Sequence, residues 1–393
     1  QRQMCIRDRV KVKQRATLDE QINTLVSHGV TFDLMDEEKA RRFLSNNSYF
    51  FKIKSYENNY RKTIDESGGY VYDNLDFGHL VELSLVDFAL SRLVWSMCSS
   101  IEHSIKVRFN QLIMKDQNPD IADICVRRCF SGNLPTMHDN PYTDDMKTGL
   151  QGDFALWNLW ELLGFNDQLT LFNTYWRYRH NENHPYQHLL FIVRKMRNAV
   201  SHGNCLLADM SRPSPHKKDT GRSDIEITKA AMRLCDKPRK TGSKTRSFQQ
   251  SLDRLVAHNY ACVLLCHLEF VDSPRALIHS CHEVQSFLDR MNQRRALYFG
   301  VAGGAREPRN ILIDSTLSAI ETLSRSYIKK ARIKADELDA KDPYGSRKQV
   351  SVEKIRERID RRKRKITDLQ TEIDNLEQRA RRLAANEAEG EQS

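Results

Sequence analysis

Residues 76–114, which read DFGHLVELSLVDFALSRLVWSMCSSIEHSIKVRFNQLIM, decide the fold. The stretch has no proline and, after Gly78, no glycine. Its large apolar residues recur every three to four positions, which is the period of a helix that buries one face. These residues are Leu80, Leu83, Phe88, Leu93, Trp95, Ile101, Ile105, Phe109 and Leu112. We therefore predict one long core helix here.

The composition of the whole 393-residue chain favours helices. Only 16 Gly and 10 Pro occur, whereas all-β folds need many tight turns built on these residues. No apolar run approaches the roughly 20 residues that cross a bilayer, which excludes a transmembrane protein. We expect an all-α protein of two or three structural units, since a domain averages roughly 150 residues.

Changes of composition along the chain predict its domains. Residues 1–9 carry no helical pattern and resemble translated adapter sequence, so we treat them as an artefact. The expected units are an N-terminal helical region at 10–75, a helical domain at 76–299, and a basic helical and coiled-coil tail at 300–393.

Two loop insertions are expected inside the helical domain, because Pro, Gly and polar or basic residues concentrate there. They lie at 116–152 and 203–247. Helical patterns are predicted at 36–44, 154–175, 185–202, 248–270 and 274–299, and one or two helices at 310–385.

The chain is basic, with 62 Lys and Arg against 52 Asp and Glu and a net charge of +10. This balance favours an anionic partner such as nucleic acid. Much of the excess lies in 217–246 and 361–365, and each segment is either a solvated surface or an RNA contact. The candidate RNA-binding residues are Lys217, Lys218, Arg239, Lys240, Lys244, Arg246, Arg361, Arg362, Lys363, Arg364 and Lys365.

The chain has nine cysteines, an odd number, mostly inside apolar segments and without a preceding signal peptide. That usage favours a reducing cytoplasm. A zinc site could be drawn from Cys262, Cys266, His267, His279, Cys281 and His282. However, Cys262 and Cys266 are four residues apart on a Leu-rich helix and behave as small core residues, and the CxxC turns of structural zinc sites are missing. We expect no metal and no cofactor.

The motif RKMRNAVSH at 194–202 carries the candidate chemistry. On a helix, Leu189, Val193, Met196 and Val200 form a narrow apolar stripe. Arg197, Asn198, Ser201 and His202 spread over the opposite side, with Asn198 and His202 on one face because they are four residues apart. The stripe should pack and the polar group should face a cleft.

An arginine, an amide and an imidazole without a metal ligand suit metal-independent cleavage of RNA. That reaction needs a base for the 2′-OH proton, an acid for the 5′-oxygen, and a cation for the charge on phosphorus. Histidine can serve as base and acid near neutral pH, and arginine matches phosphate oxygens. Arg179 with His184 and Arg275 with His282 repeat a similar spacing, and we interpret the Arg179 pair as structural or incidental.

Arg197, Asn198 and His202 together resemble the Arg-Asn-x3-His motif of HEPN-superfamily ribonucleases. Further blocks make the chain similar to the Abi-like proteins, the AbiD/AbiF abortive-infection group. These blocks are LVSHGV at 25–30, AxxFL at 40–44, YFFKIKSY at 49–56, IE at 101–102 and WNLWELLGF at 157–165. The chain departs from many relatives at Gly203, where they continue with a second histidine.

The resemblance implies an all-α HEPN-type bundle that works as a homodimer, with one Arg/His pair from each subunit at a composite site. It implies a bacterial antiphage toxin that cuts RNA, with Arg197, Asn198 and His202 as catalytic residues and Glu102 as an acidic neighbour that reaches the same cleft. The alternative is a non-catalytic HEPN dimer that holds a structured non-coding RNA.

The tail predicts a coiled coil of five heptads. Its a and d positions are Val352, Ile355, Ile359, Arg362, Ile366, Leu369, Ile373, Leu376, Ala380 and Leu383. The flanking charges favour antiparallel or heterotypic pairing, since Lys365 then meets Glu372. The run 361–365 leaves RNA binding and a solvated helix face as alternatives, and a coiled-coil scaffold without RNA is a third function hypothesis.

Overall fold

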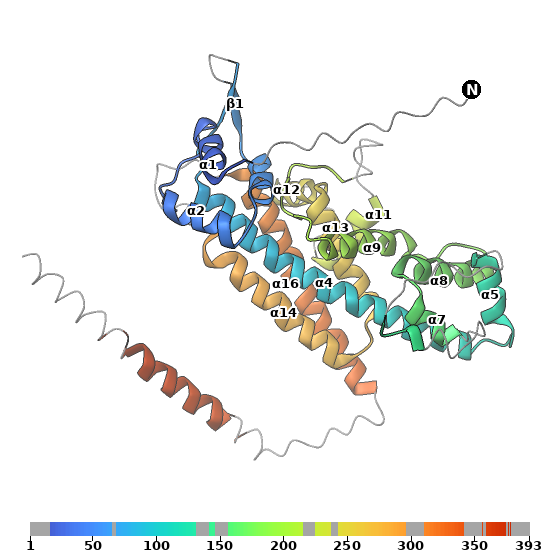
Figure 1. Cartoon of the computed structure of the whole chain (residues 1–393). Coiled ribbons are helices and arrows are strands. Elements are labelled where there is room, and N and C mark those ends of the chain that lie inside the picture. Colours follow the sequence, from blue (N-terminus) through green and yellow to red (C-terminus); the bar gives the residue numbers. More distant parts are fainter. Residues whose placement is uncertain are drawn as a thin grey trace, which may run out of the picture. The chain divides into compact units, whose positions relative to one another are not determined.

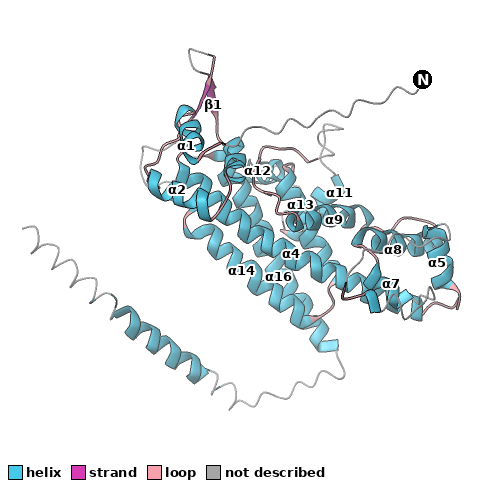
Figure 2. Cartoon of the chain, in the orientation of Figure 1, coloured by secondary structure: helices cyan, strands magenta, loops and turns pink. Residues whose placement is uncertain are grey.

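The computed structural model describes residues 16–64, 68–130, 141–145, 156–214, 225–236, 243–295 and 310–341, and tail residues 356, 359–374, 376 and 378. The chain divides into a compact unit that ends at Leu338 and a second unit from Asp339. Helices make up most of the described structure, and the two strands form one small hairpin (Figure 2). The predicted all-α class is confirmed. The expected artefact at 1–9 lies outside the described residues.

Helix α4 (Phe77–Met114) is the centre of the compact unit, as predicted (Figure 1). It begins at Asp76, whose carboxylate accepts a hydrogen bond from the Gly78 amide at 2.7 Å and so satisfies one of the free amides of the first turn. Its buried face packs on α9 (Gln187–Ser201), α13 (Leu255–Phe270) and α14 (Pro274–Gln293). Phe88 and Trp95, predicted in this core, are instead 59% and 44% exposed.

The N-terminal region holds α1 (Leu18–Ser27), α2 (Glu37–Asn46), α3 (Phe50–Lys54) and the 3-10 helix η1 (Ser55–Asn59). An antiparallel hairpin of β1 (Lys62–Ile64) and β2 (Tyr70–Tyr72) follows, where only helices were predicted. Strands are recognised by alternating apolar and polar residues, and three residues are too few to distinguish such a pattern from an irregular segment. The hairpin was therefore not predicted.

Helices occupy parts of both segments where loop insertions were expected. Helix α5 (Ile121–Phe130) packs on α8 (Phe165–His180), and α11 (Ile225–Leu234) packs on α13. Helix α12 (Ser243–Leu252) also contacts α13. In α11, Ile227, Ala231 and Leu234 are buried at helical spacing, so the basic composition around them hid a packed element.

Two predicted helices are each broken in two. Gly164 separates α7 (Leu156–Leu162) from α8, which it precedes as the N-cap residue, and the stretch predicted at 248–270 divides between α12 and α13. No described helix is long and apolar enough to cross a membrane.

Helix α16 (Ile311–Lys341) contributes a buried face to the compact unit, although residue 299 was the expected end of the helical domain. Ile313, Leu317 and Leu323 are fully buried. In the second unit, residues 359–374 are helical as predicted, and Ile359, Ile366, Leu369, Ile373 and Leu376 are between 47% and 64% exposed. The coiled-coil pairing of this stripe remains a prediction.

Candidate active site

Helix α9 positions the Arg197 motif with its apolar stripe. Val193 is fully buried and Met196 is 4% exposed, and the helix packs between α4 and α13. The opposite side of α9 faces outward, because Asn198 and His202 are exposed and the Arg197 side chain is 32% exposed. The predicted division of this helix into a packed and an open side agrees with the structure.

Arg197 reaches across to α4. Its guanidinium lies 3.6 Å from the Glu102 carboxylate and donates a 3.4 Å hydrogen bond to the Asn198 side-chain oxygen. It also lies 5.5 Å from the centre of the Trp95 ring, a cation–π contact. The structure therefore brings together three of the four predicted site residues, and Trp95 joins them.

A cavity of about 370 Å³ lies beside this cluster. Its lining residues are Trp95, Ser99, Glu102, His103, Lys106, Glu161 and Arg197. Lys106 lies 3.9 Å from Glu161 of α7, so two ion pairs cross the cavity walls. Glu161 belongs to the WNLWELLGF block, whose Trp160 indole donates a 2.8 Å hydrogen bond to Asn110 of α4.

His202 caps the C-terminus of α9 and is not one of the residues that line that cavity. Its backbone amide donates to the Asn198 carbonyl at 3.0 Å, and none of the described residues forms a hydrogen bond with its imidazole. Gly203 follows with φ of +67°, the left-handed conformation that ends many helices. One chain thus presents an exposed imidazole and, on the same helix, a guanidinium held by α4.

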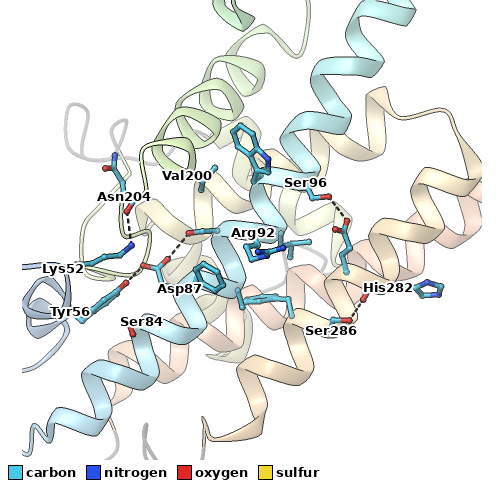
Figure 3. Close-up of a pocket in the computed structure, with 18 of the residues that line it drawn as sticks. Lys52, Tyr56, Ser84, Asp87, Arg92, Ser96, Val200, Asn204, His282 and Ser286 are labelled. Carbon is cyan, nitrogen blue, oxygen red and sulfur yellow. Dashed lines mark hydrogen bonds between the residues drawn. The ribbon is translucent and has the colours of Figure 1, made fainter. Parts of the chain in front are cut away.

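The segment after His202 is fixed by Asp87 of α4. The Asp87 carboxylate accepts a hydrogen bond from the Tyr56 hydroxyl at 2.7 Å (Figure 3). It also accepts hydrogen bonds from the backbone amides of Leu206 at 3.1 Å and Leu207 at 3.3 Å. Burial raises the pKa of Asp87, against the effect of these hydrogen bonds. Lys52 adds a 3.3 Å hydrogen bond to the Gly203 carbonyl. Sequence reasoning missed this support, because the partners are far apart in the chain.

The predicted RNA-binding lysines and arginines are described only in part. Lys217, Lys218, Arg239 and Lys240 lie outside the described residues, as do the side chains of Lys244 and Arg246 on α12. Residues 361–365 form a helical turn of five exposed cations in the second unit.

The structure describes the two other residue groups weighed in the sequence, which are the Arg179–His184 pair and the six candidate zinc ligands. The Arg179 guanidinium donates a 2.6 Å hydrogen bond to the Asp116 carboxylate. His184, the other member of this pair, is buried, and burial lowers its pKa to about 4. Among the candidate zinc ligands, both ring nitrogens of His267 lie within hydrogen-bond distance of hydroxyls, those of Ser280 and Tyr327. Within the described part of the chain, no group of three or more His, Cys, Asp or Glu side chains lies close enough together to hold a metal ion.

Comparison with known proteins agrees with the sequence blocks. No curated protein and no solved structure matches the chain. Residues 42–208, which run from α2 to the segment fixed by Asp87 and include all four candidate site residues, match the family model described as Abi-like protein. The match supports assignment of this region, residues 42–208, to the Abi-like family.

Proposed function

We propose that the protein is a metal-independent endoribonuclease of the HEPN type. The observation that carries the proposal is the geometry of α9, where Glu102 and Asn198 hold Arg197 at 3.6 Å and 3.4 Å while His202 is exposed at the end of the same helix. Arg197 would stabilise the charge on the pentacoordinate phosphorus, and His202 would carry a proton to or from an RNA oxygen. Asn198 would orient the scissile group.

A homodimer would complete this site. Transfer of two protons, from the 2′-OH and to the 5′-oxygen, calls for two proton carriers, and each chain supplies one His202. The imidazole is exposed, so a second copy related by a two-fold axis can bring its own His202 to the same phosphate. Membership of the Abi-like family supports a role in abortive infection, in which cleavage of cellular RNA by the toxin limits phage growth.

The test is RNA cleavage by the full chain in excess EDTA. We expect wild type to cleave, His202→Ala to lose cleavage, and products to end in 2′,3′-cyclic phosphate or 3′-phosphate. His180→Ala is the matched control, since His180 is an exposed histidine on α8 whose ring lies tilted against Trp176. Equal cleavage by His202→Ala and by the control would refute the assignment.

The second candidate is a non-catalytic dimer that holds a structured non-coding RNA. The five exposed cations at 361–365 favour it, because a cationic helix face binds phosphates without catalysis. Affinity for RNA that falls steeply with salt, without any product at high protein concentration, would support this alternative. Sequencing the RNA that co-purifies with His202→Ala would then separate one dedicated partner from a mixture of substrates.

A further inference from the structure

One face of α4 carries an unusual stripe beside the candidate active site. The stripe consists of Phe88, Arg92, Trp95, Ser99, Glu102 and Lys106, and its spacing of four, three, four, three and four keeps all six on one side of the helix. At 1.5 Å per residue, the stripe is about 27 Å long. Two exposed aromatic rings and three charges therefore follow one line.

Two cavities lie along this stripe and share Trp95. The smaller is the 370 Å³ cavity at Arg197. The larger, about 960 Å³, is lined by Phe88, Arg92 and Trp95 of α4, by Lys52 of α3, and by residues of α14 and of the segment after His202 (Figure 3). Because Trp95 lines both, we call them together the α4 groove. Arg197 lines the smaller cavity and contacts the shared Trp95, whereas His202 lines neither cavity.

The lining of the α4 groove combines ring faces and cations with four carboxylates, those of Asp87, Glu102, Glu161 and Glu283. Glu102 and Glu161 pair with Arg197 and Lys106. Phe88 is 59% exposed and has the Arg92 guanidinium 5.7 Å from its ring centre. Trp95 is 44% exposed and has Arg197 at 5.5 Å. Arg92 forms no ion pair with any residue that the structure describes. Aromatic faces that alternate with cations are the recognition elements for unpaired bases and phosphates.

We propose that a single-stranded RNA segment binds along the α4 groove. Its bases stack on Phe88 and Trp95, and Arg92 contacts the phosphate between them. A duplex would not fit these elements, because its base faces are already stacked inside the helix. The placement of the next phosphate at Arg197 rests on the proposed ribonuclease function, whereas binding itself depends only on the groove.

The test measures binding in a His202→Ala background, so that cleavage cannot intervene. The probe is a short fluorescent single-stranded RNA, and the same sequence annealed to its complement is the competitor. Phe88→Leu and Arg92→Gln are the test variants, because both side chains are exposed, and Arg197 keeps its contact with Trp95 in both variants. Phe191→Leu is the matched control, since Phe191 is 42% exposed on α9 and has Lys195 4.5 Å from its ring centre, outside the α4 groove.

We expect Phe88→Leu to weaken single-strand binding about tenfold, as loss of one stacked base predicts. Phe88→Trp should retain affinity, because it keeps a ring face. Arg92→Gln should reduce the slope of log affinity against log salt by about 0.7, the value for one phosphate contact on a single strand. Phe191→Leu should match the parent, and the duplex should compete poorly.

Three outcomes would overturn the inference. One is affinity of Phe88→Leu equal to that of Phe191→Leu. Another is equal binding of duplex and single strand. The third is a dimer that becomes a monomer in Phe88→Leu, which would make the groove an interface between copies. Cleavage by the wild type in EDTA is measured separately. If the wild type cleaves RNA but Phe88→Leu binds it normally, only the proposed binding site in the α4 groove is refuted. If binding depends on Phe88 but the wild type does not cleave, only the proposed ribonuclease function is refuted.

Discussion

The Glu102 carboxylate of α4 lies 3.6 Å from the Arg197 guanidinium of α9. Glu102→Gln removes the charge but keeps the shape, so Arg197 should lose its fixed orientation while its helix stays in place. We expect kcat for RNA cleavage to fall between about tenfold and about a hundredfold, since small displacements of catalytic groups have effects of this size. The free energy of unfolding should change by less than about 1 kcal/mol, because the pair is partly exposed.

The comparison variant for Glu102 is Glu161→Gln, which removes the carboxylate that pairs with Lys106 at 3.9 Å in the same cavity. Both variants change the cavity charge by the same amount, and only Glu102→Gln releases Arg197. A rate equally reduced in both would mean that cavity charge, and not the orientation of Arg197, sets the rate. Initial rates and urea unfolding curves provide the two measurements.

Asp87 predicts a link between stability and the position of His202. Asp87→Asn leaves an amide where the Leu206 and Leu207 amides and the Tyr56 hydroxyl all donate, so at least one buried donor loses its acceptor. We expect a loss of about 1–3 kcal/mol in the free energy of unfolding. Hydrogen exchange should accelerate at Leu206 and Leu207, and RNA cleavage should fall.

Tyr56→Phe is the milder variant at the same carboxylate. It removes the 2.7 Å hydrogen bond from the hydroxyl to Asp87, together with the contact of the hydroxyl with Cys205, and leaves both backbone amides bound to Asp87. Its stability should fall by about 1 kcal/mol without faster exchange at Leu206. Fast exchange in both variants would show that Asp87 does not itself hold the segment.

The left-handed conformation of Gly203 gives a third prediction. Its φ of +67° strains any residue with a Cβ, although an added Cβ would meet nothing within 4 Å. Gly203→Ala should therefore lose about 1 kcal/mol of stability through the backbone alone. Gly203→Asn should lose less, because asparagine tolerates this conformation. If thermal unfolding shows equal losses of stability in Gly203→Ala and Gly203→Asn, the losses come from changed side-chain contacts and not from backbone strain.

The sequence predicted the parts of the fold that follow one strong period. The helix predicted from Asp76 to Met114 agrees with α4 to within one residue, because a long apolar period without Pro or Gly has no competing interpretation. The β1–β2 hairpin and α11 were missed, since three-residue strands and a short helix in a basic segment give weak periods. Composition likewise grouped α16 with the tail, although its buried face joins the compact unit.

The candidate site was predictable where residues are close in sequence. The spacing of Arg197, Asn198 and His202 places them on one side of α9, but periodicity assigned Trp95 to the core of α4. Apolar period alone cannot tell which of two neighbouring faces is buried, and Trp95 lies on the face of Glu102, seven residues later. Asp87 was beyond reach for a different reason, because its partners Leu206 and Leu207 approach only through the tertiary fold.

His267 predicts how stability depends on pH. It is fully buried on α13, with its Nδ1 2.8 Å from the Tyr327 hydroxyl and its Nε2 3.2 Å from the Ser280 hydroxyl. Burial, with a smaller effect of Lys334, lowers the His267 pKa to about 3. The unfolded chain binds the proton near the ordinary value of about 6.5, so protonation favours unfolding between these values. Stability is complete above about pH 6.5 and decreases as the pH falls toward 3.

We expect His267 to account for about 2 kcal/mol of the stability lost between pH 7 and pH 5. Urea unfolding of His267→Gln should give a lower free energy of unfolding at both pH values, because the glutamine packs less well. The difference in free energy of unfolding between pH 7 and pH 5 should be smaller than in the wild type by about 2 kcal/mol. His282→Gln, which changes an exposed histidine on the next helix, should keep the wild-type difference. An unchanged difference in His267→Gln would mean that other groups, such as the buried His184 with its pKa of about 4, dominate the acid response.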